Sequence, residues 1–143
     1  MIRQLYVENG VGRDVTDTIN RFTHSHGVSA VFQHDVHPEM QRPQKGDEWW
    51  IEDIASRGMA IVTQDAAILG LAQKDRLGIT TGERQAVIDH QAHIFALGSA
   101  KYTTWQKLAC ITRHWETIDG LLQLSGPQGV VLYLSETRMV AFS

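Results

Sequence analysis

The stretch GDEWWIEDIASRGMAIVTQDAAI, residues 46–68, decides the fold. Its first half predicts one amphipathic helix, whose apolar face is formed by Trp50, Ile51, Ile54 and Ala55. Gly58 ends this helix, and MAIVT at 59–63 is apolar throughout, which is typical of a parallel strand covered on both faces. An acidic residue stands at each end of the unit, Asp47 before the helix and Asp65 after the strand.

Strands and helices alternate through the rest of the chain in the same way. Apolar patterns predict strands over 2–7, 28–32 and 93–97, and helices over 13–25, 81–92 and 104–122. The segment 34–46 is the longest predicted loop, and 129–142 reads as a terminal hairpin. Thr103 and Gln106 form a capping box before the helix over 104–122. The alternation predicts an α/β fold of three layers, α/β/α, with a mainly parallel central sheet and right-handed crossovers.

The composition is that of an ordinary globular domain. The 143 residues are 43% hydrophobic and 20% charged, which predicts a single domain over 1–143. The single cysteine, Cys110, lies in an apolar helical pattern, so we expect a buried thiol and a reducing cytoplasm. No apolar run approaches membrane-spanning length, and the start of the chain lacks the layout of a signal peptide. The net charge of −3 means that nucleic-acid binding would need local basic residues or bound cations.

Four acidic residues are predicted to meet at one edge of the sheet. Ligands of parallel sheets bind outside the carboxyl ends of the strands. Glu8 follows the first predicted strand and Asp65 the third, while Asp47 and Glu48 open a helix that runs back from the same edge. Clustered carboxylates repel each other, and a bound cation relieves the repulsion. Oxygen ligands favour Mg²⁺ or Mn²⁺, whose natural chemistry with a carboxylate site is hydrolysis of phosphodiester bonds.

Each of these acids also has a purely structural interpretation. Asp47 is a good N-cap for the helix that it opens, and Glu48 suits the first turn of a helix dipole. Asp65 can cap whatever follows its strand. The functional interpretation rests on the three positions Glu8, Asp47 and Asp65 sharing one predicted edge, and not on any one of them alone.

The motifs resemble a known family. The order YVENGVG, DEWWIEDIASRG, AIVTQD, GERQAVIDHQAHIFAL and YTTWQKL is similar to the PIN-like nucleases of the VapC toxin type, in particular their short bacterial branch. The likeness covers about residues 3–118, and its most specific part is the acid-opened helix followed by a strand that ends in Thr-x-Asp, here Thr63 to Asp65. It implies an α/β sandwich whose acids bind Mg²⁺ or Mn²⁺ and cut RNA, often restrained by a small antitoxin protein. Asp47 and Asp65 match two of the family's acids, and Glu48 can share the second position.

The chain departs from the family at the first acid. The first strand of the family normally ends in Asp, whereas Glu8 stands here. An alternative register places Val7 at that position, but the glycine-rich NGVGR after Glu8 favours Glu8. The longer side chain can change the geometry or the choice of ion. The rival hypothesis is therefore a degenerate PIN-like domain that acts as a protein- or RNA-binding module.

Other residues are candidates for contacting a substrate or a partner. The resemblance gives Arg84 a place near the active edge, where it can contact a phosphate, and Thr63 is a second substrate-binding candidate. Trp49, Trp50 and Trp105 are candidates for base stacking, although packing in the core or an interface is the ordinary role of tryptophan. The apolar helix over 104–122 can serve the core or a homodimer.

Two further interpretations belong to other classes of site. His34 and His37 have a spacing found in zinc sites, although no third ligand accompanies them. A phospho-acceptor receiver domain also places acids at strand ends with a lysine after a late strand, roles that Asp65 and Lys101 would fill. The second acid position opens a helix instead of following the first strand, which counts against the receiver.

Overall fold

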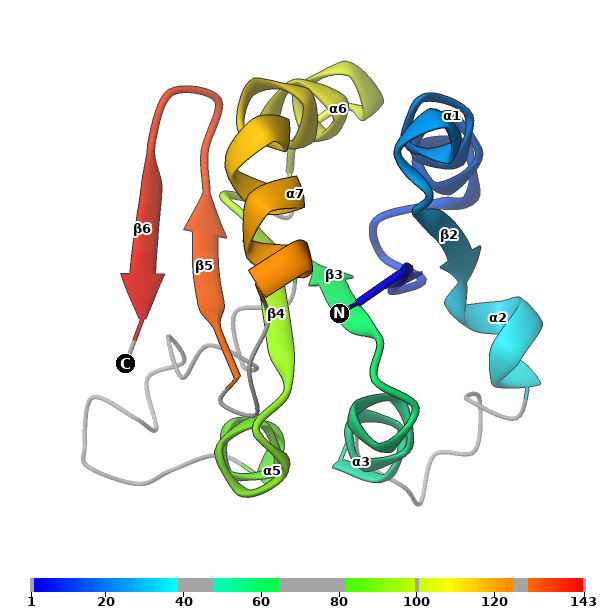
Figure 1. The fold of residues 1–143 in the computed structure, drawn as a ribbon, viewed down its shortest axis with the longest axis vertical. Coiled ribbons are helices and arrows are strands. Elements are labelled where there is room, and N and C mark those ends of the chain that lie inside the picture. Colours follow the sequence, from blue (N-terminus) through cyan, green and yellow to red (C-terminus); the bar gives the residue numbers. More distant parts are fainter. Residues whose placement is uncertain (1, 39–47, 65–81, 100, 125–128, 143) are drawn as a thin grey trace.

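The computed structural model describes residues 2–38, 48–64, 82–99, 101–124 and 129–142. They form one sheet with helices on both faces, so the expected three-layer α/β/α architecture is confirmed (Figure 1). Within the described residues, no helix has both the length and the apolar character needed to cross a membrane.

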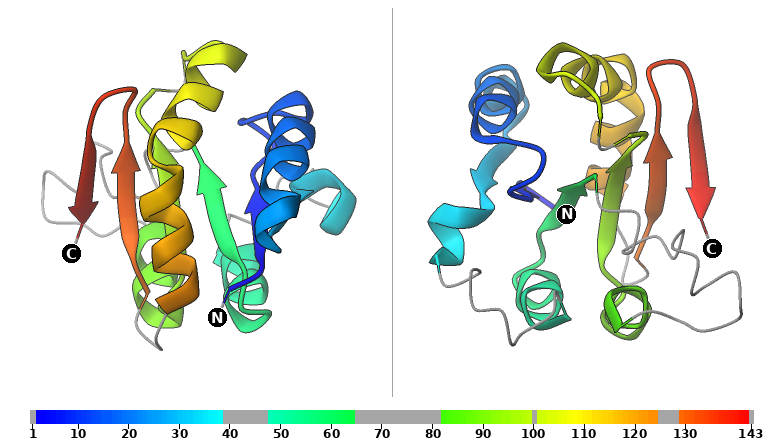
Figure 2. Two further views of the ribbon diagram at one scale, coloured as in Figure 1. Left: turned by 45° about the horizontal axis from the view of Figure 1, so that its top comes forward. Right: turned by 180° about the vertical axis from the view of Figure 1, so that it is seen from behind.

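The sheet has six strands in the order β2-β1-β3-β4-β5-β6. Their bounds are Gln4–Val7 for β1, Ser29–Phe32 for β2, Ala60–Thr63 for β3, His93–Leu97 for β4, Val131–Leu134 for β5 and Met139–Phe142 for β6. The first five strands are parallel, and β6 pairs antiparallel with β5 as the expected terminal hairpin (Figure 2). The carboxyl ends of β1 to β5 therefore meet at one edge.

The helices divide between the two faces of this sheet. They are α1 (Arg13–Thr23), α2 (Gln33–Val36), α3 (Glu48–Ser56), α5 (Gly82–His90), α6 (Thr104–Arg113) and α7 (Trp115–Leu124), with a short 3-10 turn, η1, at His24–His26. Helices α1, α6 and α7 cover one face, and α3 and α5 cover the other (Figure 1). Each parallel strand is thus joined to the next by a helix on an identified face of the sheet. The face of that helix determines the direction in which the chain turns after each strand.

The core follows the two-residue period of the strands. In β1, Leu5 and Val7 pack under α1, α6 and α7, whereas Tyr6 between them points to the face of α3 and α5. All four residues of β3 are buried, as the apolar run at 59–63 predicted for a strand covered on both sides. Burying each large apolar side chain contributes about 1.5–3 kcal/mol. The two hydrophobic layers hold the strand ends in register.

The helix predicted over 104–122 is wrong as a single element, because it breaks at His114 into α6 and α7. His114 has left the helical conformation, and its Nε2 lies 3.0 Å from the Ser135 carbonyl oxygen. Trp115, the first residue of α7, is buried against Phe22 of α1. The tertiary contacts of these two residues therefore favour a bend over a continuous helix.

The N-terminus of α6 is as predicted, but the packing of its tryptophan is not. Thr103 and Gln106 form the expected capping box, with distances of 3.2 and 2.9 Å. Packing in the core is the ordinary role of tryptophan, yet 81% of the surface of Trp105 is exposed. The buried face consists of Leu108, Cys110 and Ile111, and Trp105 lies off that face in the first turn. The buried position of Cys110 is as expected.

Candidate functional site

The candidate site lies where the strand order reverses. After β1 the chain moves outward to β2, and it then returns to place β3 on the other side of β1. The connection that leaves β1 runs through α1 on one face, and the connection that leaves β3 runs through α5 on the opposite face. In open parallel sheets, ligands bind in the crevice that such diverging connections leave at the carboxyl ends of the strands.

Glu8 stands at this switch point, one residue beyond β1. Its backbone N–H donates to the Val62 carbonyl oxygen of β3 at 2.9 Å, and its own carbonyl accepts from the Val11 N–H at 3.0 Å. Its Oε2 accepts a hydrogen bond of 2.8 Å from the hydroxyl of Thr63, the last residue of β3. Backbone and side chain are both held, so the half-buried carboxylate has a defined orientation.

The side chain of Thr63 contacts Glu8 from the interior of the protein. Its side chain is fully buried, at 0% exposure, and its hydroxyl points to the carboxylate. This position suits a residue that orients the acid more than one that touches a substrate. The substrate-binding role of Thr63 stays a prediction, and in the structure its hydroxyl donates to Glu8.

Gln64 follows Thr63 directly at the carboxyl end of β3. A Cβ atom added at Gly10 would lie 2.8 Å from Gln64 Nε2 and 3.3 Å from Glu8 Oε1, so the amide and the carboxylate approach Gly10 together. The amide oxygen, Gln64 Oε1, is buried and has no hydrogen-bond partner among the residues that the structure describes. Glycine at position 10 leaves the space in which these two groups sit.

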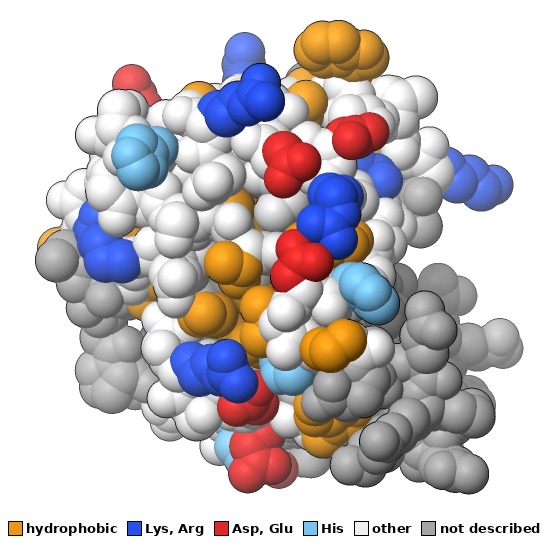
Figure 3. Space-filling model, turned by 90° about the vertical axis from the view of Figure 1, so that its right-hand side faces the viewer, with side chains coloured by type: hydrophobic (Ala, Val, Ile, Leu, Met, Phe, Trp, Pro, Cys, Tyr) orange, Lys and Arg blue, Asp and Glu red, His pale blue; other side chains and the backbone are white. Residues whose placement is uncertain are grey.

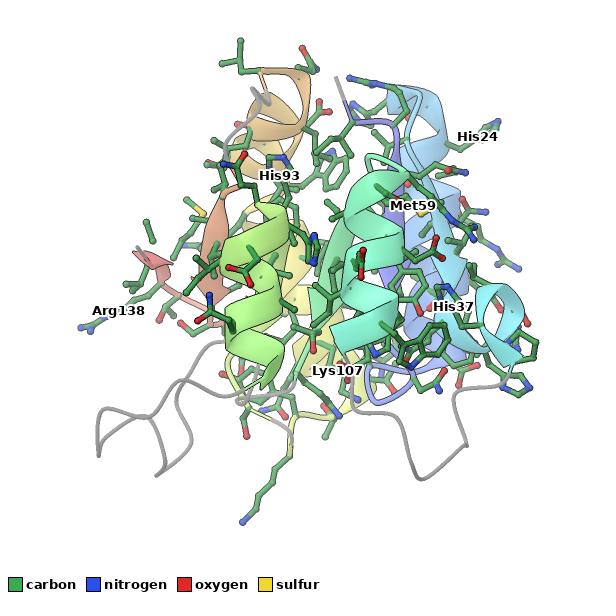
Figure 4. The ribbon with its side chains drawn as sticks, turned by 90° about the horizontal axis from the view of Figure 1, so that it is seen from below. His24, His37, Met59, His93, Lys107 and Arg138 are labelled. Atoms are coloured by element: carbon green, nitrogen blue, oxygen red, sulfur yellow. The ribbon has the colours of Figure 1, made fainter. Side chains whose placement is uncertain are left out.

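Lys107 fixes the loop that follows Glu8. Its Nζ donates to the carbonyl oxygens of Gly10 and Val11, at 3.2 and 3.1 Å. In Figure 4 Lys107 lies in the lower half of the view and Met59, which precedes β3 at the amino edge of the sheet, in the upper half. The ammonium group thus brings a positive charge to the loop that follows Glu8.

Gln33 holds the same loop from its other side. It follows β2, is 1% exposed, and accepts a hydrogen bond of 2.9 Å from the Asn9 N–H through Oε1. Sequence reasoning missed Gln33, Gln64 and Lys107. The sequence contains one indication of the two glutamines, because Gln33 and Gln64 each come directly after a predicted strand. Residues at that position lie at the carboxyl edge, where parallel sheets bind ligands.

The remaining predicted site residues are only partly within the described chain. Asp47 and Asp65 lie outside the described residues, and so do the side chains of Glu48 and Arg84. The backbone of Glu48 begins α3, and Arg84 lies in the first turn of α5. Both helices precede a strand of the parallel sheet, so each starts at the carboxyl edge.

The start of α3 is tied to the carboxyl half of β1. Trp50, the third residue of α3, stacks on Tyr6 with ring centroids 5.3 Å apart and an angle of 30° between the planes. Tyr6 is two residues before Glu8, and Trp50 is three residues after Asp47. Both aromatic side chains are fully buried. The stacking therefore brings the chain that follows Asp47 to the same part of the sheet as Glu8.

His37 is part of a buried network and not of a zinc site. Its Nδ1 lies 2.7 Å from the Tyr6 hydroxyl, and its Nε2 lies 2.6 Å from Asp53 Oδ2 (Figure 4). Arg57 closes the network with an ion pair of 2.9 Å to Asp53. Burial opposes ionisation of Asp53, but the hydrogen bonds from His37 and Arg57 outweigh it and lower its pKa. Both ring nitrogens of His37 are engaged, so the zinc interpretation of His34 and His37 is wrong for His37.

The face beside β2 and α2 has charges of both signs. Acidic and basic side chains alternate over it (Figure 3), and Arg13 pairs with Asp35 at 2.8 Å. The hydrogen bond from Arg13 is the main cause that lowers the pKa of Asp35. This face does not have the single-sign surface that tracks a nucleic-acid backbone.

Glu8 supplies a carboxylate at the switch point, a ligand type that Mg²⁺ and Mn²⁺ accept. The Gln64 atom that lies with this carboxylate against Gly10 is the amide nitrogen, Nε2, which is not a metal ligand. Among the residues described, no cluster of three or more His, Cys, Asp or Glu side chains is placed to hold a metal. The described side chains thus provide one acid of the predicted set.

Comparisons with family models, curated proteins and solved structures find no match for this chain. The strand order identifies the fold but not the function. Doubly wound sheets with the order 2-1-3-4-5 occur in proteins of several functions, phospho-acceptor receivers among them. Lys101, the lysine that a receiver would need, is exposed to solvent.

Proposed function

We propose that this protein is a metal-dependent endoribonuclease that hydrolyses RNA phosphodiester bonds at the switch point between β1 and β3. The observation that carries the proposal is the Glu8 carboxylate, held in place by Thr63 at the position where parallel sheets bind ligands. Asp65 follows Thr63 by two residues, and Asp47 directly precedes α3. These three acids form the proposed catalytic set.

Glu8, Asp47 and Asp65, with Glu48 beside the second position, would hold Mg²⁺ or Mn²⁺. When bound, such an ion activates a water molecule and neutralises charge on the phosphate. The chain's own task is to keep the carboxylates in register. Thr63 does this for Glu8 through its hydroxyl, and Lys107 and Gln33 do it through the loop after Glu8.

The proposed RNA path runs past the start of α6. Trp105 is 81% exposed in the first turn of this helix, and helix side chains lean toward the N-terminus, here beyond the carboxyl edge. Lys101 is exposed just before the helix. An exposed aromatic ring next to a cation is the usual combination for binding single-stranded RNA by stacking. Arg84 is the proposed phosphate contact on the α5 side.

The resemblance to VapC-type nucleases also suggests a role for the protein in the cell. We propose that the chain is the toxin of a type II toxin–antitoxin pair, acts in the cytoplasm and is restrained by a small antitoxin protein. A homodimer through the apolar face of α6 and α7 is disfavoured, because Leu108, Ile111, Ile118 and Leu122 of that face are buried within the chain. Any dimer would need another surface.

The test is cleavage of a labelled structured RNA by the purified protein with Mn²⁺ or Mg²⁺. We expect cutting that stops in EDTA and in Asp65→Asn, while Asp14→Asn, which removes an exposed acid in the first turn of α1, cuts like the wild type. If the wild type does not cut, or if Asp65→Asn still cuts, the nuclease proposal fails. Metal binding without cutting would then favour the binding module, and phosphorylation of Asp65 by acetyl phosphate would favour the receiver.

A further inference from the structure

The outer edge of β6 is an unpaired edge of the sheet. β6 is the last strand in the order, and none of the described strands pairs with its outer side (Figure 1). Such an edge presents backbone N–H and C=O groups to which another strand can bond, and proteins usually protect it with a charged residue, a proline or a bulge. The strand MVAF contains neither a charge nor a proline, and its register with β5 runs without a bulge.

The pairing with β5 determines which backbone groups of β6 point outward. The Ser135 N–H donates to the Arg138 carbonyl oxygen at 2.8 Å, so these two residues form a hydrogen-bonded pair. In an antiparallel ladder, hydrogen-bonded and non-hydrogen-bonded pairs alternate. Along the register Val140 therefore bonds β5, whereas Met139 and Ala141 direct their N–H and C=O groups away from it.

We propose that the edge of β6 binds the same edge of a second copy of this chain, in antiparallel orientation. A two-fold axis through Val140 would set Met139 of each copy opposite Ala141 of the other. Each of these pairs can exchange both of its N–H···O=C hydrogen bonds, so the outward groups of one edge satisfy those of the other. The two sheets would become one continuous sheet. This inference does not depend on the proposed nuclease activity.

The exposed side chain of Val140 favours a second copy as the occupant. Val140 is 47% exposed although it is a large apolar residue in a strand. On the two-fold axis it would face its own counterpart in a non-hydrogen-bonded pair, the kind in which opposite side chains lie closest. A cross-strand pair of β-branched side chains stabilises a sheet, so dimerisation would bury Val140 in a favourable contact.

The charge next to β6 favours the antiparallel orientation. Arg138 directly precedes the strand and is exposed. In the antiparallel register the two copies of Arg138 lie about 14 Å apart along the strands, beyond the distance of about 10 Å at which salt screens exposed charges. A parallel pair would place them side by side, where like charges destabilise a sheet. Because the edge is short, we expect a reversible dimer that forms at high protein concentration.

Sedimentation equilibrium over a range of protein concentrations tests the proposal. The mass of the wild type should rise from that of a monomer toward that of a dimer. Val140→Lys would set two like charges opposite each other and should raise the dissociation constant by at least about tenfold. Ile88→Lys introduces the same charge at another exposed aliphatic position, on α5, and should associate like the wild type. The Tm of both variants should stay near that of the wild type.

Two further variants test the register. Ala141→Pro removes an outward N–H and leaves the hydrogen bonds to β5 in place, so it should also weaken association. Val140→Cys would place two thiols in a non-hydrogen-bonded pair, whose Cα separation of about 4.5 Å permits a disulfide. Mild oxidation should then yield a covalent dimer, whereas Leu124→Cys, at a residue that is 83% exposed, should remain monomeric. The native Cys110 is buried in all of these proteins.

The outcomes decide the proposal without reference to RNA cleavage. Concentration-dependent dimers that Val140→Lys weakens and Ile88→Lys does not would support the β6 edge as the interface. A wild type that stays monomeric at every concentration would overturn the proposal and leave the edge to a strand of a different protein. Dimers that Val140→Lys and Ala141→Pro leave unchanged would overturn it as well, because the interface would then lie elsewhere.

Discussion

The hydroxyl of Thr63 donates to Glu8 Oε2 across 2.8 Å, which joins the last residue of β3 to the residue that follows β1. The two residues are 55 positions apart in the chain and meet because β1 and β3 are hydrogen-bonded neighbours. A fully buried hydroxyl thus contacts a half-buried carboxylate at the carboxyl edge, where open parallel sheets in general bind ligands.

Replacing Thr63 with valine should separate positioning from folding. Thr63→Val keeps the branched shape but removes the hydrogen bond, so we expect Mn²⁺ affinity to fall by about tenfold, as it does when a group that orients a ligand is lost. Thr63→Ser should restore most of it. The matched control is Thr16→Val, because the Thr16 hydroxyl is buried and bonds the Gly12 carbonyl at 2.9 Å. Equal loss of Mn²⁺ affinity in both valine variants would contradict the role of Thr63.

Lys107 should matter for the loop after Glu8. Lys107→Met removes the hydrogen bonds to the Gly10 and Val11 carbonyls while keeping an apolar stem. We expect the free energy of unfolding to fall by about 1–2 kcal/mol, since hydrogen bonds from charged groups are the stronger ones. RNA cleavage should also fall, because the loop positions Glu8. Denaturant melts of Lys107→Met and of Lys101→Met check this, and the exposed Lys101 should leave stability unchanged.

Trp105 should contribute to RNA binding and not to folding. Its ring is 81% exposed, so Trp105→Ala should leave the Tm nearly unchanged. Stacking on one base contributes about 1–3 kcal/mol, which corresponds to a loss of about 5- to 150-fold in affinity for single-stranded RNA. Fluorescence anisotropy in EDTA measures this without cleavage. Leu124→Ala is the control, because Leu124 is 83% exposed at the far end of α7. Unchanged affinity in Trp105→Ala would remove Trp105 from the RNA path.

His93 should make stability depend on pH. Burial lowers the pKa of His93 below its ordinary value of 6.5, and its Nδ1 accepts the Val130 N–H at 3.2 Å. The unfolded chain therefore binds a proton more readily than the folded one. The stabilisation is complete above pH 6.5 and is lost as the pH falls through that value toward the lower folded pKa.

The pH effect can be assigned by substitution. Denaturant unfolding at pH 7.5 and at pH 5.5 should show a larger drop in stability for the wild type than for His93→Asn, which cannot take up the proton. The other histidines are present in both proteins and cancel in the comparison. Equal drops in the two proteins would show that His93 is not the titrating group.

The sequence determines the sheet edge but not the full site. The apolar run at 59–63 and the alternation of elements were enough to place Glu8 and the end of β3 together, because parallel strands end at one edge. The contacts of Gln64 and Lys107 depend on how the loop after β1 folds over Gly10, which no local pattern encodes. The break at His114 escaped prediction for a similar reason, since the contact to Ser135 comes from the distant β5 end.

Cleavage of labelled RNA by three forms of the protein tests the role of Glu8 as the first acid of the site. The forms are the wild type, Glu8→Gln and Glu116→Gln, which changes an exposed glutamate in the first turn of α7. With Mn²⁺ present, we expect the wild type and Glu116→Gln to cut at equal rates and Glu8→Gln to lose activity by at least about a hundredfold, with its Tm retained. Full activity in Glu8→Gln would contradict a metal-dependent nuclease site at the β1–β3 switch point.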